Sequence, residues 1–215
     1  MNNTPFVVAY LLLMALVPVF LAANQDVPAG SSYLQIVLFL SLAAFGLVLG
    51  QFWLSRLLPP SVAKIKPAVV LRWHKIVGYS AVGFLLIHPV LMVARRFWAQ
   101  ESDPTENLIL MLRAPALQPA FVAWVVMVLL GVLSLARRRF RPKSWRILHG
   151  LLSAGFAGLA TWHVVAVGRH SNPAMSLFWI ALAGFAVWAL LRSYMPILSA
   201  RTSTVNKGVA HEIAR

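Results

Sequence analysis

The stretch LRWHKIVGYSAVGFLLIHPVLM (residues 71–92) decides the fold of this chain, and SWRILHGLLSAGFAGLATWHVVAV (residues 144–167) repeats its pattern. Each stretch is apolar and carries two histidines fourteen residues apart, His74 with His88 and His149 with His163. Fourteen residues of α-helix turn through roughly 1400°, within about 40° of whole turns, and rise about 21 Å. The sequence therefore predicts two helices, each with one histidine near either face of a bilayer core of about 30 Å.

The composition places the chain in a membrane. Of its 215 residues 60% are hydrophobic and 11% charged, and the mean hydropathy is +0.77. Soluble domains carry about 25% charged residues, and one soluble core of this size could not bury so much apolar surface. The formal charge of +14 comes from basic residues at the ends of apolar runs. We therefore expect contact with lipid and no binding of nucleic acid. With no cysteine, disulfides, thiolate haem ligation and iron–sulfur ligation are excluded.

Six apolar segments are long enough to cross a bilayer. Residues typical of turns separate them, and the first segment lacks the basic start of a secretory signal, so we expect it to be retained. The sequence predicts an all-α integral membrane protein, with a six-helix transmembrane domain over residues 1–196 and a cytoplasmic polar tail over 197–215. The six segments are Pro5–Ala23, Tyr33–Leu54, Val69–Ala94, Gln118–Ala136, Trp145–Val167 and Met175–Leu191.

The basic residues predict the orientation. Fifteen of the nineteen lie in the connections after the second and fourth segments or in the tail, and four of the five acidic residues lie on the opposite side. Because lysine and arginine are in excess on the cytoplasmic side of membranes, both termini are expected in the cytoplasm. We expect the bacterial inner (plasma) membrane. The third and fifth segments cross in the same direction, which places His74 and His149 near the cytoplasmic face.

Two pairs of histidines at one spacing favour ligation of two stacked b-type haems, because such a haem takes one axial imidazole from each side. A single histidine near a helix end would be typical of an interfacial residue, but imidazole within lipid is costly unless it is paired or ligated. Small residues between the histidines leave room for a flat macrocycle, or for close packing of helices. They include Gly78, Ala81 and Gly83 in the third segment and Gly150, Ala154, Gly155, Ala157, Gly158 and Ala160 in the fifth.

Cationic side chains near the two interfaces are candidates for contact with haem propionates. Arg72, Lys75 and Arg146 are placed for the cytoplasmic haem, and Arg95, Arg96 and Arg169 for the outer one. Each is also typical of an ordinary interfacial anchor. His170 follows the fifth segment and is expected to be a solvated loop residue.

The motifs HKIVGY from His74, LLIHPVLM from Leu85, WRILH from Trp145 and WHVV from Trp162 resemble the ferric reductase-like transmembrane domain. That family includes ferric-chelate reductases, NADPH oxidases and a bacterial haem subunit that feeds a periplasmic methionine sulfoxide reductase. The resemblance covers roughly the second to sixth segments. It implies haem ligation by His74 with His149 and by His88 with His163, and a path for electrons from flavin to haem.

The chain departs from the family after Pro196, where about twenty residues follow without a glycine-rich phosphate loop. We therefore expect FAD or FMN and NAD(P)H to act through a cytoplasmic flavoprotein reductase or a further domain. The predicted function is transmembrane electron transfer to an acceptor on the far side: a ferric chelate, oxygen, a quinone or a redox protein.

Other functions stay open. Within the family, the chain is compatible with the haem subunit of a methionine sulfoxide reductase system or the membrane part of a superoxide-producing oxidase. From other classes, it is compatible with a transporter whose histidines bind a metal ion directly, or with an assembly subunit whose sites are vestigial. The sequence does not decide whether the chain is an enzyme by itself.

Overall fold

The structure, a computed structural model, describes residues 4–28, 30–56, 66–98 and 103–213. These residues form helices and connections and contain no strand, so the all-α prediction is confirmed. The α-helices are α1 (Thr4–Ala23), α2 (Ser32–Arg56), α4 (Pro67–Trp98), α5 (Pro104–Arg113), α6 (Gln118–Leu135), α7 (Pro142–Val167) and α8 (Pro173–Ile213), with 3-10 turns η1 (Pro115–Leu117) and η2 (Arg137–Arg139).

Several helices begin at a proline that follows a capping residue, as local chemistry favours. The Asp103 side chain accepts a hydrogen bond of 2.7 Å from the Thr105 backbone N–H at the start of α5. The Asn172 side chain accepts one of 2.8 Å from the Met175 N–H at the start of α8. These caps satisfy backbone donors that a helix start leaves without a partner.

Five helices are long and apolar enough to span a membrane: Ser32–Leu54, Pro67–Ala94, Pro115–Leu135, Pro142–Val167 and Pro173–Tyr194. They correspond to five of the six predicted segments. The apolar stretch Val7–Ala23 of α1 is shorter, so its crossing stays a prediction. The sequence did not predict α5, and α8 continues through the predicted polar tail as far as Ile213.

The contacts between the spanning helices close into a ring. In chain order α2 packs on α4, α4 on α6, α6 on α7 and α7 on α8, and α8 returns to α2. Helix α1 lies outside the ring against α2. Helices α4 and α7, which carry the histidines, run in the same direction, as predicted, but they are not neighbours. The interior between them is therefore available for a site.

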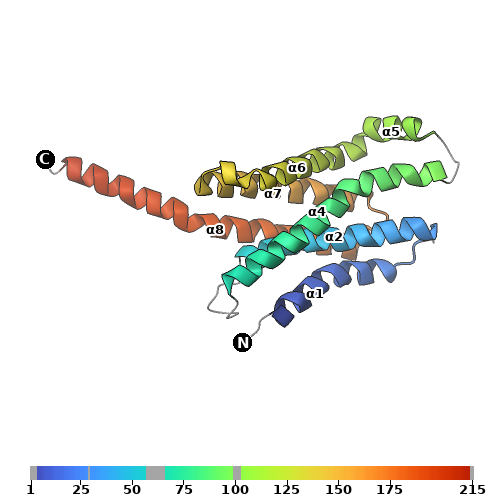
Figure 1. The fold of residues 1–215 in the computed structure, drawn as a ribbon, viewed down its shortest axis with the longest axis horizontal. Coiled ribbons are helices and arrows are strands. Elements are labelled where there is room, and N and C mark those ends of the chain that lie inside the picture. Colours follow the sequence, from blue (N-terminus) through green and yellow to red (C-terminus); the bar gives the residue numbers. More distant parts are fainter. Residues whose placement is uncertain (1–3, 29, 57–65, 99–102, 214–215) are drawn as a thin grey trace.

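The beginning of α1 and the end of α8 lie on one side of the bundle (Figure 1). The main core lies beside the ring interior, where Leu49 of α2, Ala157 of α7 and Trp179 of α8 are all fully buried. Many other large apolar side chains, such as Leu151 and Leu177, are about two-thirds exposed. Lipid is the solvent that such a surface requires.

Candidate functional site

Two cavities lie between α4 and α7, one near each end of the ring. His74 and His149 line the first, which we call the inner cavity. His88 and His163 line the second, the outer cavity. Their volumes are about 310 Å³ and about 170 Å³. The structure thus brings together the four predicted histidines in the two predicted pairs, with one member of each pair from each helix.

The imidazoles of the inner cavity are spaced as two ligands of one metal would be. The ring centres of His74 and His149 lie 6.4 Å apart, with an angle of 78° between their planes. A metal held at about 2.0 Å by each imidazole, with each ring centre about 1.1 Å behind its nitrogen, separates the ring centres by roughly 6 Å. Trp145 stacks on His149 at 4.9 Å between centres and 24° between planes, which restricts the rotation of that ring.

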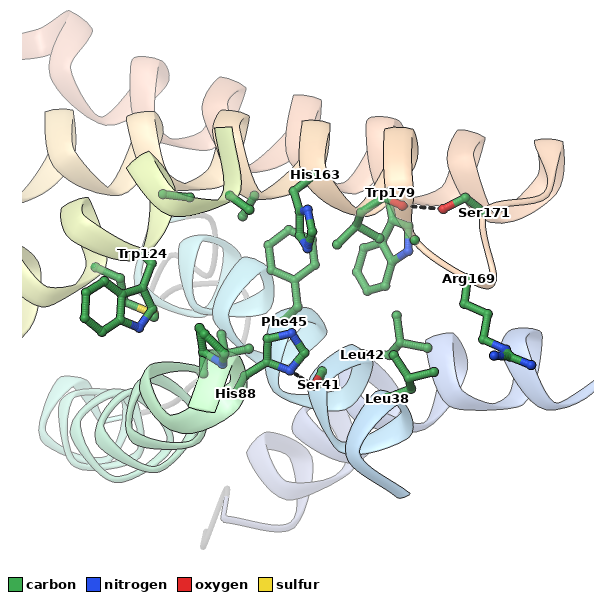
Figure 2. A pocket seen from close by; sticks show the side chains of 18 of the residues that line it. Leu38, Ser41, Leu42, Phe45, His88, Trp124, His163, Arg169, Ser171 and Trp179 are labelled. Atoms are coloured by element: carbon green, nitrogen blue, oxygen red, sulfur yellow. Dashed lines mark hydrogen bonds between the residues drawn. The ribbon is translucent and has the colours of Figure 1, made fainter. Parts of the chain in front are cut away.

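Side chains from several helices line the outer cavity (Figure 2). His88 and His163 face each other across it, with Phe45 of α2 beside them. The Nδ1 atom of His88 lies 2.8 Å from the hydroxyl of Ser41. The Nδ1 atom of His163 is buried and has no hydrogen-bond partner in the described part of the chain. Both rings are half-buried, and a buried imidazole nitrogen without a partner fits a site that needs a further ligand.

The glycines divide between the two roles that the sequence left open. Gly78 and Gly131 line the inner cavity, and a Cβ added at either would meet no atom within 4 Å, so they provide space. Gly150 also lines the inner cavity, but it packs closely, because its Cβ would collide with the Tyr194 side chain. Gly155 and Gly158 are exposed and line neither cavity. Only some of the predicted small residues therefore shape the sites.

The cationic residues differ in part from the predicted set. Lys75, Arg137 and Arg146 line the inner cavity, so Arg146 lies where it was expected. Arg72 is exposed and lines neither cavity. A role for Arg72 at the inner site therefore stays a prediction. Lys75, about one turn further along α4, was expected at this site, and Arg137 of η2 was not.

At the outer end, Arg169 lines the outer cavity. Its guanidinium donates a hydrogen bond to the Pro28 backbone carbonyl, and Figure 2 shows it directed away from the paired imidazoles. This contact ties the α7–α8 connection to the α1–α2 connection. The Arg95 side chain, also predicted for this site, lies outside the described residues.

Comparison with known proteins agrees with this geometry. Residues 40–160, more than half of the chain, match the family described as ferric reductase like transmembrane component. The chain belongs to the ferric reductase-like transmembrane family. A relative from Archaeoglobus fulgidus, described as an uncharacterized protein, is 29% identical over 174 residues, which cover 79% of this chain and 95% of the relative. No solved structure matches the chain significantly.

Two features of this ferric reductase-like domain were not evident from its sequence. Arg137 lines the inner cavity, although the sequence shows it only as one of several consecutive arginines that indicate the orientation in the membrane. His170 lies in the α7–α8 connection, as expected, but it also lines the outer cavity and is partly buried. Its ring lies 5.8 Å from that of Phe39, and its backbone carbonyl accepts a hydrogen bond of 3.0 Å from Gln25. The signals were weak, because both residues lie in connections whose path only the folded chain sets.

Proposed function

We propose that this chain carries electrons across the membrane by holding two b-type haems, one in each cavity. The observation that carries the proposal is the arrangement of histidines in pairs across two stacked cavities, with the His74 and His149 rings at the spacing that one shared metal requires. When bound, each haem would supply a one-electron redox centre. The side chains of the ring would supply ligation, orientation and exclusion of water.

The residues of each cavity have separable tasks in this proposal. His74 with His149 would hold the inner haem iron through their imidazole nitrogens, and His88 with His163 would hold the outer one. Lys75, Arg137 and Arg146 stand at the inner cavity, where cations would neutralise propionates. The apolar walls keep the local dielectric low, which strengthens these electrostatic interactions.

The inner cavity is also the proposed side of electron entry. The basic residues near it give that face a positive potential, which would attract an acidic flavoprotein reductase through long-range electrostatics. The acceptor at the outer face is proposed to be a ferric chelate, oxygen, a quinone or a redox protein. Among these, the outer cavity favours a small acceptor that approaches beside His170 and Arg169, which line it at its end of the bundle.

A transporter that binds metal ions directly is less well supported. A lone ion is usually held by three or four clustered ligands. In the part of the chain that the structure describes, no three His, Asp or Glu side chains are grouped in that way. Histidines in separate pairs suit a planar cofactor that supplies the remaining ligands itself.

The number of haems per chain and single substitutions of the four histidines test the proposal. Purified protein should contain two non-covalent haems b per chain by pyridine haemochrome analysis. His74→Ala and His149→Ala should remove the same haem signal, and His88→Ala and His163→Ala the other. One haem in fully loaded protein, or loss of one signal by both His74→Ala and His88→Ala but not by His149→Ala, would contradict the pairing.

Oriented vesicles test the direction. A flavoprotein reductase with NADPH, added at the basic face, should reduce an impermeant ferric chelate trapped inside, and the initial rate should fall as salt screens docking over a Debye length of about 8 Å. Reduction by dithionite should respond little to salt. Electron delivery from the outer face alone would reverse the proposed direction.

A further inference from the structure

The imidazole of His88 is joined to α2 by a chain of two hydrogen bonds. Its Nδ1 atom lies 2.8 Å from the Ser41 hydroxyl oxygen (Figure 2). That hydroxyl donates a bond of 2.6 Å to the Val37 backbone carbonyl. Serine hydroxyls in membrane helices commonly donate to the carbonyl one turn earlier. Here the same hydroxyl also meets a histidine that lines the outer cavity.

Counting protons fixes the direction of both bonds. The Val37 carbonyl can only accept, and the Ser41 hydroxyl has one proton, which is directed to that carbonyl. With its proton directed there, the Ser41 oxygen accepts a hydrogen bond from the Nδ1–H of His88, which is the tautomer that carries hydrogen on Nδ1. In a neutral imidazole the other nitrogen, Nε2, is then the one with a free lone pair. This is the atom that can bind a metal.

The backbone around His88 is also held from two sides. The Tyr33 hydroxyl of α2 donates to the Leu91 carbonyl at 3.1 Å. The Trp124 indole of α6 donates to the Leu86 carbonyl at 3.0 Å. Both bonds attach to α4 within three residues of His88, beside Pro89, which lacks an N–H for the helical ladder. A helix segment weakened by proline is thereby kept in one position.

We propose that Ser41 is a positioning residue for His88: it selects the tautomer that presents Nε2 to the outer cavity and makes the imidazole a stronger donor to haem iron. The inference rests on the proposed function. A group that accepts a hydrogen bond from the non-ligating nitrogen of a metal-bound histidine fixes the tautomer of that histidine and raises its basicity as a ligand. A more basic ligand favours the ferric state, so Ser41 lowers the potential of the outer haem and makes it a better reductant for its acceptor.

Redox titration of the full-length, haem-loaded protein tests this role. Ser41→Ala should raise one midpoint potential and leave the other unchanged, by an amount on the order of a tenfold change in the reduction equilibrium, about 59 mV for one electron. The electron paramagnetic resonance signal of the same ferric haem should broaden, because the His88 ring is no longer held at one angle. Ser41→Thr keeps the hydroxyl, so it should have the midpoint potential and the signal width of the wild-type protein.

A matched control separates this role from a general effect of losing a hydroxyl. Ser80 lies on the exposed face of α4 and lines neither cavity, so Ser80→Ala should change neither potential. If Ser41→Ala does not accumulate, Ser41→Cys, with a weakly accepting sulfur of similar size, should show the same shift. Performing the titration in a His149→Ala background, where the outer haem alone should remain, assigns the shifted signal.

The possible results separate this inference from the proposed function. If the protein binds two haems and neither Ser41→Ala nor Ser41→Cys changes either potential, the proposed role of Ser41 is wrong. The proposed electron transfer is not affected by that result. Equal shifts of both haems, or no rescue by Ser41→Thr, would also overturn the role of Ser41, because a positioning role acts on one site through one hydroxyl. A wild-type protein that binds no haem would overturn the proposed function itself.

Discussion

Phe156 of α7 meets Phe45 of α2 edge to face, with ring centres 6.4 Å apart and planes at 81°. Phe45 in turn lies 4.9 Å from the Trp179 ring of α8. Phe156 also lines both cavities, as does Met127 of α6. A single apolar layer, held by contacts between helices, therefore divides the interior of the ring into two compartments.

Removal of the Phe156 ring should destabilise the bundle and perturb both compartments. Phe156→Ala should cost about 3–5 kcal/mol, the usual range for a buried phenylalanine, and should alter the visible spectra of both haems. Thermal unfolding in detergent and absorption spectroscopy measure the two effects. Phe20→Ala is the matched control, because Phe20 is 67% exposed; an equal loss in both variants would argue against the dividing layer.

The contact between α1 and α2 depends on Gly46. A Cβ at this position would collide with the Met14 backbone carbonyl, and the Tyr10 hydroxyl bonds to the Gly50 carbonyl at 2.8 Å one turn away. Gly46→Ala should therefore push α1 from the ring and lower stability by about 1–3 kcal/mol. Limited proteolysis and thermal unfolding would detect this change.

Gly184→Ala provides the comparison for Gly46→Ala. A Cβ at Gly184 meets no atom within 4 Å, and alanine favours a helix over glycine by about 1 kcal/mol in soluble hosts. Its stability should be unchanged or slightly higher. If both variants unfold at the wild-type temperature, α1 does not contribute to the stability of the bundle through Gly46.

Arg137 should matter for the inner site although Arg138 and Arg72 do not. All three side chains are exposed, but only Arg137 lines the inner cavity, and the other two line neither cavity. Arg137→Gln should weaken retention of the inner haem and shift its potential downward, since a nearby cation favours the reduced, less positive state. Arg138→Gln and Arg72→Gln should leave both unchanged in potentiometric titrations. A uniform effect of all three would indicate only a change in surface charge.

The stability of the bundle around the outer cavity should depend on pH because of His170. Partial burial, followed by the charge of Arg169, holds the pKa of His170 below its ordinary value of 6.5. The folded chain then binds fewer protons than the unfolded chain, so this residue reduces stability as the pH falls through 6.5 toward the lower pKa of the fold.

Unfolding temperatures of wild-type protein and His170→Gln, measured at about pH 8 and about pH 5, test this dependence. The wild type should lose more stability than the variant on acidification. Arg169→Gln should reduce the difference, because it removes the second cause of the lowered pKa. Identical losses in wild type and His170→Gln would show that His170 keeps an ordinary pKa.

Periodicity and charge in the sequence determined the helices, their order and the histidine pairs. The fourteen-residue spacing sets His74 above His88 and His149 above His163 on their helices, because helical geometry is local and independent of packing. An apolar run needs only its own length and hydropathy to be identified as a span. These features follow from neighbours in the chain, so they could be predicted without coordinates.

The closure of the ring was decided only by tertiary structure. Helices α4 and α7, which share the histidine pairs, are joined through α6 on one side and through α2 and α8 on the other. Which cation reaches a cavity depends on where connections fold back, so the sequence did not indicate that Arg137 lines the inner cavity. The bond from Ser41 to His88 joins residues 47 apart, and such contacts between helices depend on side-chain packing that no local pattern encodes.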